Sequence, residues 1–227
     1  MTYVFPPPPR VALPVTGSDA LFPVRRVYCV GRNYADHAIE MGADSREPPF
    51  FFSKPADSLV PGGGDVPYPP LTGNLQHEVE LVVALAAGGA QIPVSRALDC
   101  VFGYAVGLDL TRRDVQQRAK DKGHPWDMAK GFDHSAPIGA IAPLTACGHP
   151  AQGAIQLRVN GQLRQNGDLG QISWKVAEVI ANLSTHVRLE AGDLIFTGTP
   201  AGVSTVVRGD LLEAVVAGVG ELTVRLI

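Results

Sequence analysis

Two glutamates stand at the start of an apolar run in the segment His77-Glu78-Val79-Glu80-Leu81-Val82-Val83. Side chains of an extended strand alternate between its two faces, so Glu78 and Glu80 point the same way. One interpretation is a half-buried strand whose wet face carries both residues, and alternation alone favours it because ordinary strands show this pattern. The other is a buried strand that holds two carboxylates for a site, since charges in apolar surroundings are costly unless they are paired or bind a metal.

A third carboxylate, Asp109, lies inside a second apolar run that extends from Phe102 to Leu110. If this carboxylate converges with Glu78 and Glu80, the three form a site with oxygen ligands only. Oxygen ligands suit a hard divalent cation such as Mg2+ or Mn2+. The two apolar runs therefore give the best indication of chemistry in the chain.

Composition bounds the class of protein. The chain has 227 residues, enough to bury a core that needs no disulfides. Its formal net charge is -3 and it has no basic block, which argues against a nucleic-acid-binding protein. Three scattered cysteines are typical of a reducing compartment, and no apolar run is long enough to span a membrane. Its start lacks the features of a signal peptide, so the sequence predicts a soluble cytoplasmic protein.

The chain divides into a short arm and one domain. Residues 1–22 are rich in proline, which predicts an extended arm, and residues 23–227 contain no linker and predict a single domain. Strands are expected at 27–30, 50–54, 77–85, 102–110, 193–197 and within 211–227, and Asn160-Gly161 predicts a hairpin. Helices are expected at 35–41, from a capping box at Thr111 to about Gly123, and from Ser173, with a long loop at 55–74. The pattern indicates an α+β fold dominated by β-structure.

A histidine and a glutamate fall three residues apart on the helix expected at 35–41, so His37 and Glu40 share one face. A histidine oriented by a carboxylate can act as a general base on water. Two unrelated surface residues would show the same spacing, and the pair alone does not distinguish the two interpretations.

Two lysines and one glycine-rich turn leave similar alternatives. Lys54 and Lys130 each end a segment with apolar residues, where a lysine either binds an anionic group or extends from the core to solvent. The small residues from Thr197 to Gly202 either cradle a carboxylate with backbone N–H groups or form a plain turn.

A set of short stretches extends from about residue 25 to the C-terminus. They are Cys29-Val30-Gly31-Arg32-Asn33-Tyr34-Ala35-Asp36-His37, Phe52-Ser53-Lys54-Pro55, His77-Glu78-Val79-Glu80-Leu81, Gly107-Leu108-Asp109-Leu110-Thr111, Arg113-Asp114-Val115-Gln116 and Asp193-Leu194-Ile195-Phe196-Thr197-Gly198-Thr199-Pro200. In this order they resemble the fumarylacetoacetate hydrolase family, and within it the acylpyruvate hydrolases. The proline-rich opening followed by Phe22-Pro23-Val24-Arg25-Arg26 is similar to the bacterial branch that acts on fumarylpyruvate.

The resemblance implies a mixed β-sheet rolled into a sandwich-like barrel, a homodimer, and a Mg2+ or Mn2+ site. It assigns the metal ligands as Glu78, Glu80 and Asp109, the water-activating dyad as His37 and Glu40, and an active-site lysine as Lys130. Four further residues are expected to bind substrate: Lys54, Arg113, Gln116 and Thr199.

The resemblance also implies the reaction. We expect hydrolysis of a carbon–carbon bond in an acylpyruvate, most closely the conversion of fumarylpyruvate to fumarate and pyruvate in gentisate-type aromatic catabolism. The alternatives on the same metal are decarboxylation of oxaloacetate and isomerisation or decarboxylation of a dienedioate. A catalytically silent module that binds organic acids would show a decayed site, whereas every expected ligand is present. The expected partner is a small keto acid, with no nucleic acid and no membrane.

Overall fold

The computed structural model describes residues 2–34 and 47–227. Its strands are β1 (Ala12–Val15), β2 (Ser18–Pro23), β3 (Arg26–Gly31), β4 (Phe50–Lys54), β5 (Leu59–Pro61), β6 (Gly64–Val66), β7 (Leu75–Gln76), β8 (Val79–Leu85), β9 (Val101–Leu108), β10 (Thr111–Arg112), β11 (Ala136–Ile138), β12 (Ala142–Pro143), β13 (Ala154–Val159), β14 (Gln162–Asp168), β15 (Asp193–Phe196), β16 (Thr205–Val206), β17 (Leu211–Val216) and β18 (Gly220–Leu226). The helices are α2 (Val94–Ala97), α3 (Arg113–Lys122), α4 (Asp127–Lys130), α5 (Leu144–Cys147) and α6 (Val176–His186), with 3-10 turns at Ala56–Ser58, Leu98–Cys100 and Leu169–Gln171. None of the helices in these two ranges is long and apolar enough to cross a membrane. The helix predicted at 35–41 lies outside the described residues.

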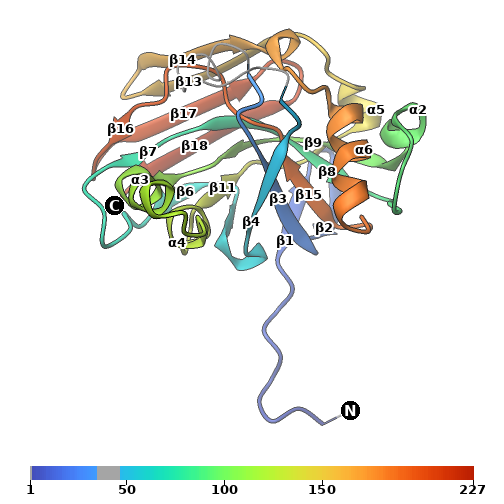
Figure 1. Cartoon of the computed structure of the whole chain (residues 1–227), viewed down its shortest axis with the longest axis horizontal. Helices are drawn as coiled ribbons and strands as arrows, with labels where there is room; N and C mark the ends of the chain where they lie inside the picture. Colours follow the sequence, from blue (N-terminus) through green and yellow to red (C-terminus); the bar gives the residue numbers. More distant parts are fainter. Residues whose placement is uncertain (1, 35–46) are drawn as a thin grey trace.

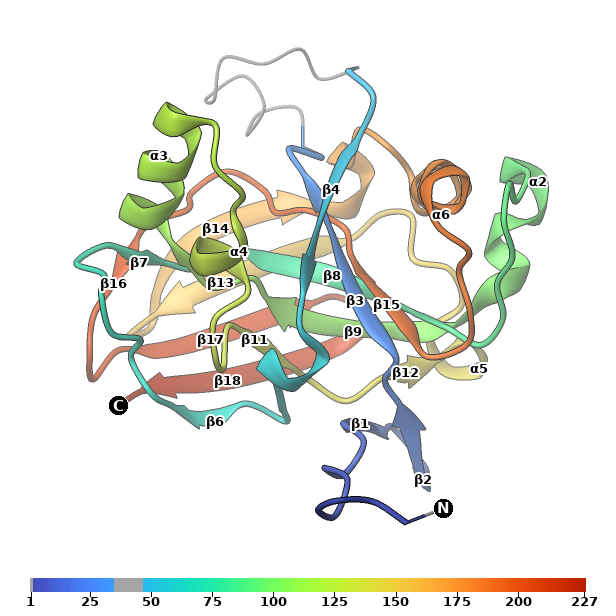
Figure 2. The ribbon, with the colours of Figure 1, turned by 60° about the horizontal axis from the view of Figure 1, so that its bottom comes forward.

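The largest sheet crosses the middle of the molecule (Figures 1 and 2). Its strand order is β4-β3-β15-β8-β9-β11-β5, with β12 paired to β9. The sheet is mixed, because β15 is parallel to β3 but antiparallel to β8. A second sheet has the order β14-β13-β17-β18-β6, and three short strands form β10-β7-β16. The β-dominated α+β fold with a curled mixed sheet is therefore confirmed.

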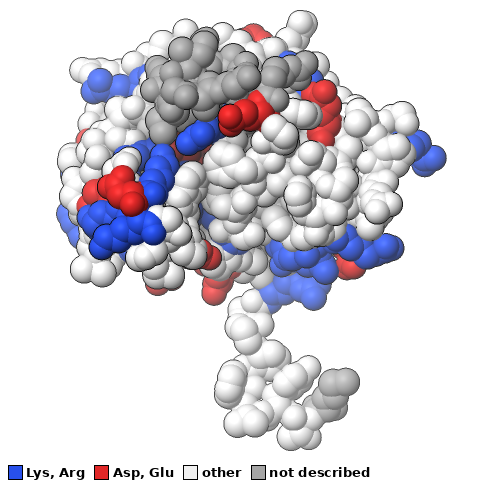
Figure 3. Space-filling model, viewed as in Figure 1, with Lys and Arg blue, Asp and Glu red and all other residues white. Residues whose placement is uncertain are grey.

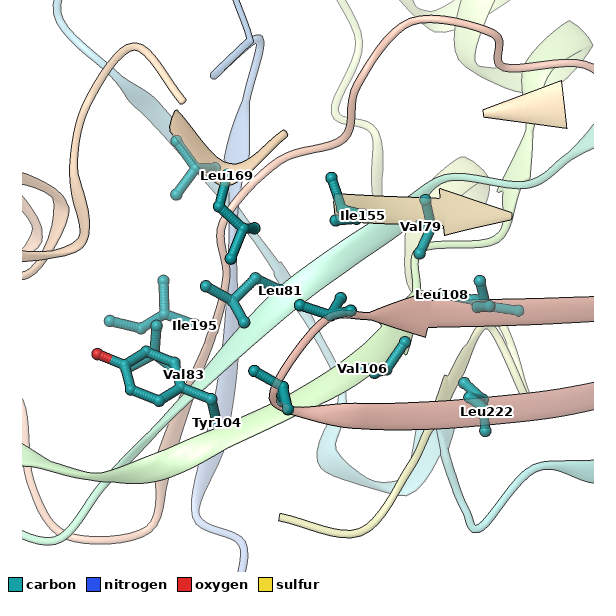
Figure 4. Close-up of a cluster of buried hydrophobic side chains, with 14 of the residues drawn as sticks. Val79, Leu81, Val83, Tyr104, Val106, Leu108, Ile155, Leu169, Ile195 and Leu222 are labelled. Carbon is teal, nitrogen blue, oxygen red and sulfur yellow. The ribbon is translucent and has the colours of Figure 1, made fainter. Parts of the chain in front are cut away.

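The main hydrophobic core lies between the two larger sheets. In Figure 4, Val79, Leu81 and Val83 of β8 point toward the side that carries Ile155 and Leu222 of the second sheet. These residues alternate with Val82 and Ala84, which belong to a second buried cluster on the other face of the same sheet. Full burial of one such side chain contributes about 1.5–3 kcal/mol relative to exposure.

Strand β8 is buried at every one of its positions. It pairs with β15 on one edge and β9 on the other, and apolar clusters cover both of its faces. The wet-face interpretation of Glu78 and Glu80 is therefore wrong. A strand buried on both faces has a nearly continuous apolar sequence, so a charge on it needs a reason.

The N-terminal segment differs from the extended arm expected for residues 1–22. Residues 12–23 form the hairpin β1–β2, which turns at Gly17 with a φ of +75°. Leu13 and Phe22 are buried in the second cluster with Val27. Only the residues before the hairpin extend away from the body of the molecule (Figure 1). The high proline content of residues 1–22 led to the prediction of an extended arm. The short alternation of apolar residues, which packs this hairpin against the core, was overlooked.

Three local predictions also need correction. Within the loop expected at 55–74, strands β5 and β6 form parallel pairs with β11 and β18, partners too distant in sequence for local patterns to reveal. Helix α3 begins at Arg113 with no side-chain cap, because the Thr111 hydroxyl donates instead to the Asp109 carbonyl. Helix α6 begins at Val176 rather than at Ser173. The predicted end of α3 at left-handed Gly123 and the Asn160-Gly161 hairpin are confirmed.

Candidate metal centre and cleft

Three carboxylates meet where the chain enters β8 and leaves β9. Glu80 lies opposite Gly107 across the ladder. Two positions further along, just beyond the ladder, Asp109 lies beside Glu78, whose carbonyl accepts the Asp109 N–H at 2.8 Å. Opposed side chains of an antiparallel pair have Cβ atoms about 5 Å apart. Carboxylate oxygens of the three residues all lie within 4.8 Å of one another, and the residues are 6%, 2% and 0% exposed for Glu78, Glu80 and Asp109. The convergence that the two apolar runs left open, and that the family resemblance implies, is present in the structure.

Two basic side chains neutralise part of this charge from the α3–α4 side. Lys130, the last residue of α4, donates from Nζ to Glu78 Oε2 at 2.8 Å and to Asp109 Oδ2 at 2.7 Å. Arg113, the first residue of α3, pairs through one NH2 group with the other oxygen of Glu78. Buried carboxylates are tolerated when cations and hydrogen bonds compensate them. Lys130 and Arg113 thus form ion pairs with the carboxylates of this centre within the protein itself.

A third cation, Lys54, is fully buried at the end of β4. Its Nζ lies 2.9 Å from Asp109 Oδ1, and it donates to the carbonyl oxygens of Leu110 and Ser135 at 3.3 and 3.1 Å and to that of Lys130. Lys54 is not among the residues that line the cleft described below. Its place differs from the substrate contact predicted from the sequence, because its ammonium is occupied by Asp109 and backbone oxygens.

The two glutamates ionise differently. Burial acts to raise the pKa of Glu78, but the positive charges of Lys130 and Arg113 outweigh it and hold the pKa below its usual range. Burial raises the pKa of Glu80 well above its usual range, and the negative charges of Asp109 and Glu78 raise it further. The N–H of Gly198, which donates to Glu80 Oε2 at 2.8 Å, opposes this only in part. Glu80 is therefore the carboxylate that most lacks a positive partner.

The donor set fits a divalent metal ion. Glu78, Glu80 and Asp109 offer oxygen atoms only, which hard cations such as Mg2+ and Mn2+ prefer. Asp109 Oδ1 is buried and accepts no hydrogen bond of good geometry, even though Lys54 lies close to it. A cation bound here would supply the positive charge that Glu80 lacks.

The turn after β15 holds the carboxylate cluster in place. Gly198 has a φ of +98°, and a Cβ there would lie 2.8 Å from the Cβ of Asn33, so the position requires glycine. This conformation aims its N–H at Glu80, while the Thr199 hydroxyl donates to the Val79 carbonyl at 2.8 Å. One backbone N–H of this turn therefore binds a carboxylate in this structure, and that carboxylate belongs to Glu80.

A buried relay supports Thr199 from behind. Gln165 of β14 donates from Nε2 to Thr199 Oγ1 at 2.7 Å, and its Oε1 accepts the Val79 N–H at 3.0 Å. His77 contacts the same Oε1 through Nδ1 at 2.8 Å and Ser204 Oγ through Nε2 at 2.9 Å. Burial lowers the pKa of His77, so this imidazole is held neutral. The relay orients the turn rather than the reacting groups.

A cleft opens onto the cluster, and its empty space is about 420 Å³ when the part open to solvent is included. Its floor is Glu78, Glu80 and Asp109, and its walls come from the end of β3, from β4, from α3 and α4, and from the turn after β15. Arg113, Gln116, Lys130 and Thr199, four residues predicted to touch substrate or reacting groups, line it. The predicted dyad, His37 and Glu40, lies outside the described residues.

The sequence profile described as "Fumarylacetoacetate (FAA) hydrolase C-terminal" matches residues 26–227, nearly the whole chain. The chain belongs to this family. The predicted resemblance is therefore confirmed, and the three carboxylates lie within the residues that the family profile matches.

Three individual relatives show which members of the family this chain is similar to. The crystal structure of fumarylpyruvate hydrolase from Pseudomonas aeruginosa in complex with Mn2+ and pyruvate is 51% identical, with a TM-score of 0.97, covering 100% of this chain and 99% of that one. Fumarylpyruvate hydrolase of Ralstonia sp is 44% identical over 79% of this chain and 93% of its own length. The mitochondrial oxaloacetate tautomerase FAHD1 of Mus musculus is 43% identical over 86% of this chain and 88% of its own length.

Several residues of the site escaped the sequence-based prediction. Gln165 is 88 positions from His77, and no local pattern connects them. Lys120 and Trp126 line the cleft beside predicted residues but read as an ordinary helix face and a loop aromatic. The spacing of Lys120 from Arg113 and Gln116, seven and four residues, is a signal that could have found it, because such residues share one helix face.

Proposed function

We propose that this chain is a metal-dependent hydrolase that cleaves fumarylpyruvate to fumarate and pyruvate. The observation that carries the proposal is the buried Glu78, Glu80 and Asp109 cluster at the floor of the cleft, in a chain 51% identical over its full length to an enzyme with that activity. Burying three carboxylates close together costs free energy on folding, and a bound cation would compensate that cost.

The metal would be held by Glu78, Glu80 and Asp109. The chemistry that Mg2+ or Mn2+ supplies when bound at such a site is Lewis-acid stabilisation of negative charge on oxygen. Lys130 and Arg113 add fixed positive charge beside the same carboxylates. The keto-acid end of the substrate would therefore lie against the floor of the cleft, in the region of highest positive charge once a cation is bound.

The hydrolytic step needs a base and donors to an oxyanion. His37, oriented by Glu40, is the proposed base that takes a proton from water as the water attacks the distal carbonyl. Lys130 and Gln116 are the proposed donors to the oxyanion that forms. Arg113 donates from NH1 to Gln116 Oε1 at 2.6 Å, which fixes the amide and leaves its N–H groups as donors. The carbon–carbon bond then breaks, and protonation of the departing enolate gives pyruvate.

The test follows fumarylpyruvate by its ultraviolet absorbance with metal-stripped protein, then with Mn2+ or Mg2+, while fumarate and pyruvate are measured separately. We expect no turnover without metal and equal amounts of both acids with it. Loss of substrate without fumarate would contradict hydrolysis, and turnover that survives complete metal removal would contradict the role of the carboxylate cluster.

Oxaloacetate is the second candidate substrate, because the mouse relative is named for a reaction of oxaloacetate. Tautomerisation and decarboxylation both need an enolate stabilised at the same floor but no attacking water. The same protein should be assayed with oxaloacetate for enol–keto exchange and for pyruvate formation. If His37→Ala abolishes fumarylpyruvate cleavage and preserves an oxaloacetate reaction, the two reactions share the metal but not the base.

The homodimer expected from the family is also a proposal for this chain. Light scattering on a sizing column would measure its mass in solution. A mass close to twice 24.0 kDa is expected, and a mass of one chain would contradict it.

A further inference from the structure

Two basic side chains at the cleft have no acidic partner among the described residues. Four basic residues line it, and two of these, Lys130 and Arg113, form ion pairs with Glu78. Arg32 and Lys120 form no ion pair with any carboxylate of residues 2–34 and 47–227, and each lies over an aromatic ring. Part of the positive charge of the cleft is therefore uncompensated.

Unlike Arg32 and Lys120, Arg113 already uses its guanidinium in hydrogen bonds and an ion pair within the protein. Its Nε donates to Gln76 Oε1 at 2.6 Å, one NH group donates to Gln116, and the other pairs with Glu78. All three sides of the guanidinium are thus occupied before a ligand enters. Within the described part of the chain, neither Arg32 nor Lys120 has a comparable set of polar contacts.

An aromatic pair connects the two uncommitted cations. The Arg32 guanidinium lies 5.8 Å from the centre of the Phe50 ring, and Lys120 Nζ lies 5.3 Å from that of Trp126. The two rings are 5.5 Å apart and nearly perpendicular, at 85°. The two rings are in edge-to-face contact, so each cation lies beside one ring of a single aromatic pair.

The backbone fixes Arg32 at a cost. Its φ is +58°, a left-handed conformation that non-glycine residues seldom adopt. Before it, Gly31 has no room for a Cβ, which would fall 2.0 Å from the Phe50 ring. After it, the Asn33 amide donates to the Thr197 carbonyl at 2.8 Å. Strain of this kind persists where the surroundings impose it, and it is concentrated at binding and catalytic sites.

Helix α3 presents Lys120 to the cleft. Arg113, Gln116 and Lys120 follow one another at helical spacing on a single face, and all three line the cleft. Lys122 lies two residues further, on another face, and is exposed. Figure 3 shows basic side chains over α3 and α4 at the left of the view, with acidic side chains among them. One helix face therefore carries both the residue that contacts the carboxylate floor and the uncommitted lysine.

We propose that Arg32 and Lys120 form an anion subsite that binds the distal carboxylate of a dicarboxylic keto acid whose keto-acid end lies at the carboxylate floor. The inference rests on the proposed function for the placement of the keto-acid end. It assigns the preference for a dicarboxylic over a monocarboxylic acyl group to these two residues, neither of which touches the floor.

The electrostatics of Lys120 agree with this subsite. Burial lowers the pKa of Lys120, and the positive charges of Arg113, Arg32 and Lys130 lower it further. Cations held near one another without an anion repel, and a bound carboxylate removes that repulsion. Such a carboxylate would also accept charge-assisted hydrogen bonds, which are stronger than neutral ones.

A binding measurement tests the subsite without turnover. The probes are 2-oxoheptanedioate and 2-oxoheptanoate, which have the same chain length as fumarylpyruvate and differ from each other only in the distal carboxylate. Calorimetric titration of Mn2+-loaded protein should show at least roughly tenfold tighter binding of the dicarboxylate, in line with hydrogen bonds to charged groups. In Lys120→Gln and Arg32→Gln this preference should fall to near unity, mainly through weaker binding of the dicarboxylate.

Lys122→Gln is the matched control, because it removes the same charge from the same helix outside the cleft. It should keep the full preference, and thermal unfolding should show that all three variants are folded. Equal affinity of wild type for the two probes would overturn the subsite, as would an unchanged preference in both Lys120→Gln and Arg32→Gln. An equal fall in the affinity for both probes would assign the residues a general role and would also overturn it.

Turnover separates this inference from the proposed function. If wild type prefers the dicarboxylate probe and the variants do not, but fumarylpyruvate is not cleaved, the subsite stands and the reaction is wrong. If fumarylpyruvate is cleaved and the probes bind equally, the reaction stands and the subsite is wrong. In the case that both hold, Lys120→Gln should raise the KM for fumarylpyruvate roughly tenfold or more and change kcat less.

Discussion

The two faces of strand β8 are equally buried, but one carries apolar side chains of the core and the other carries a carboxylate of the site. On one face, Val79, Leu81 and Val83 pack into the main core, and on the other Glu80 stands among apolar side chains and two further carboxylates. Neighbouring residues such as Leu81 and Glu80 are equally hidden from water, at 0% and 2% exposed. Burial stabilises the first and raises the pKa of the second. The difference teaches that burial alone does not distinguish a residue that supports the fold from one that serves a site.

Glu80→Gln should produce the largest effect. Gln keeps the shape and can still accept the Gly198 N–H, but it removes one of three anionic ligands. We expect turnover to fall roughly a thousandfold, since metal chemistry supplies several kcal/mol of charge stabilisation. The metal-free variant should unfold at the same temperature as wild type or higher, because repulsion with Asp109 and Glu78 is relieved. The exposed Glu221→Gln is the control, and a Glu80→Gln enzyme with normal turnover would break the comparison.

Lys54→Met should destabilise the fold by about 3–5 kcal/mol, because it removes one of the two cations paired with the buried Asp109 and leaves Oδ1 without a positive neighbour, with only Lys130 at Oδ2. Chemical denaturation measures this, with the exposed Lys122→Met as control. Mn2+ should recover part of the loss, since it returns a cation to Asp109. If Lys54 contacts substrate instead, the variant will show a raised KM and little loss of stability.

Leu81→Ala, one residue from Glu80, tests the apolar face. Loss of a fully buried leucine should lower the free energy of unfolding by about 2–5 kcal/mol, from lost burial and the cavity left behind. Folded protein should still bind Mn2+ with nearly normal affinity. The comparison would fail if Leu81→Ala lost metal binding while remaining as stable as wild type.

Metal should stabilise the protein more as the pH rises. In the metal-free protein the folded-state pKa of Glu80 lies well above its ordinary value of 4.5, so the folded state binds more protons than the unfolded state between these two values. Stability from this group is therefore present below 4.5 and is lost as the pH rises through the folded-state pKa. Metal binding requires the ionised form and cancels that loss. Thermal unfolding with and without Mn2+ across this range should show a widening difference, and a constant difference would contradict the ionisation assigned to Glu80.

The sequence was informative where local periodicity coincides with tertiary structure. The period of two placed Glu78 and Glu80 on one face, and the apolar run around Asp109 indicated a second buried strand. Both predictions needed only alternation and the cost of burying charge. The choice between a wet face and a metal site needed the resemblance, because alternation is the same in both.

The remainder depends on contacts between distant segments. The role of Lys54 follows from carbonyl oxygens of Leu110, Lys130 and Ser135, which three separate segments bring to one ammonium. The relay from Gln165 to Thr199 joins β14 to the turn after β15. Neither arrangement has a local signature, since each partner alone reads as an ordinary surface or strand residue.

Titration of metal-free protein with Mn2+, followed by electron paramagnetic resonance of the free ion, tests the central claim most directly. The claim is that the buried face of β8 and β9 holds a divalent metal through Glu78, Glu80 and Asp109. We predict one tightly bound Mn2+ per chain in wild type and in Leu81→Ala, and loss of that binding in Glu80→Gln and Asp109→Asn. Undiminished Mn2+ binding in both carboxylate variants would contradict the account.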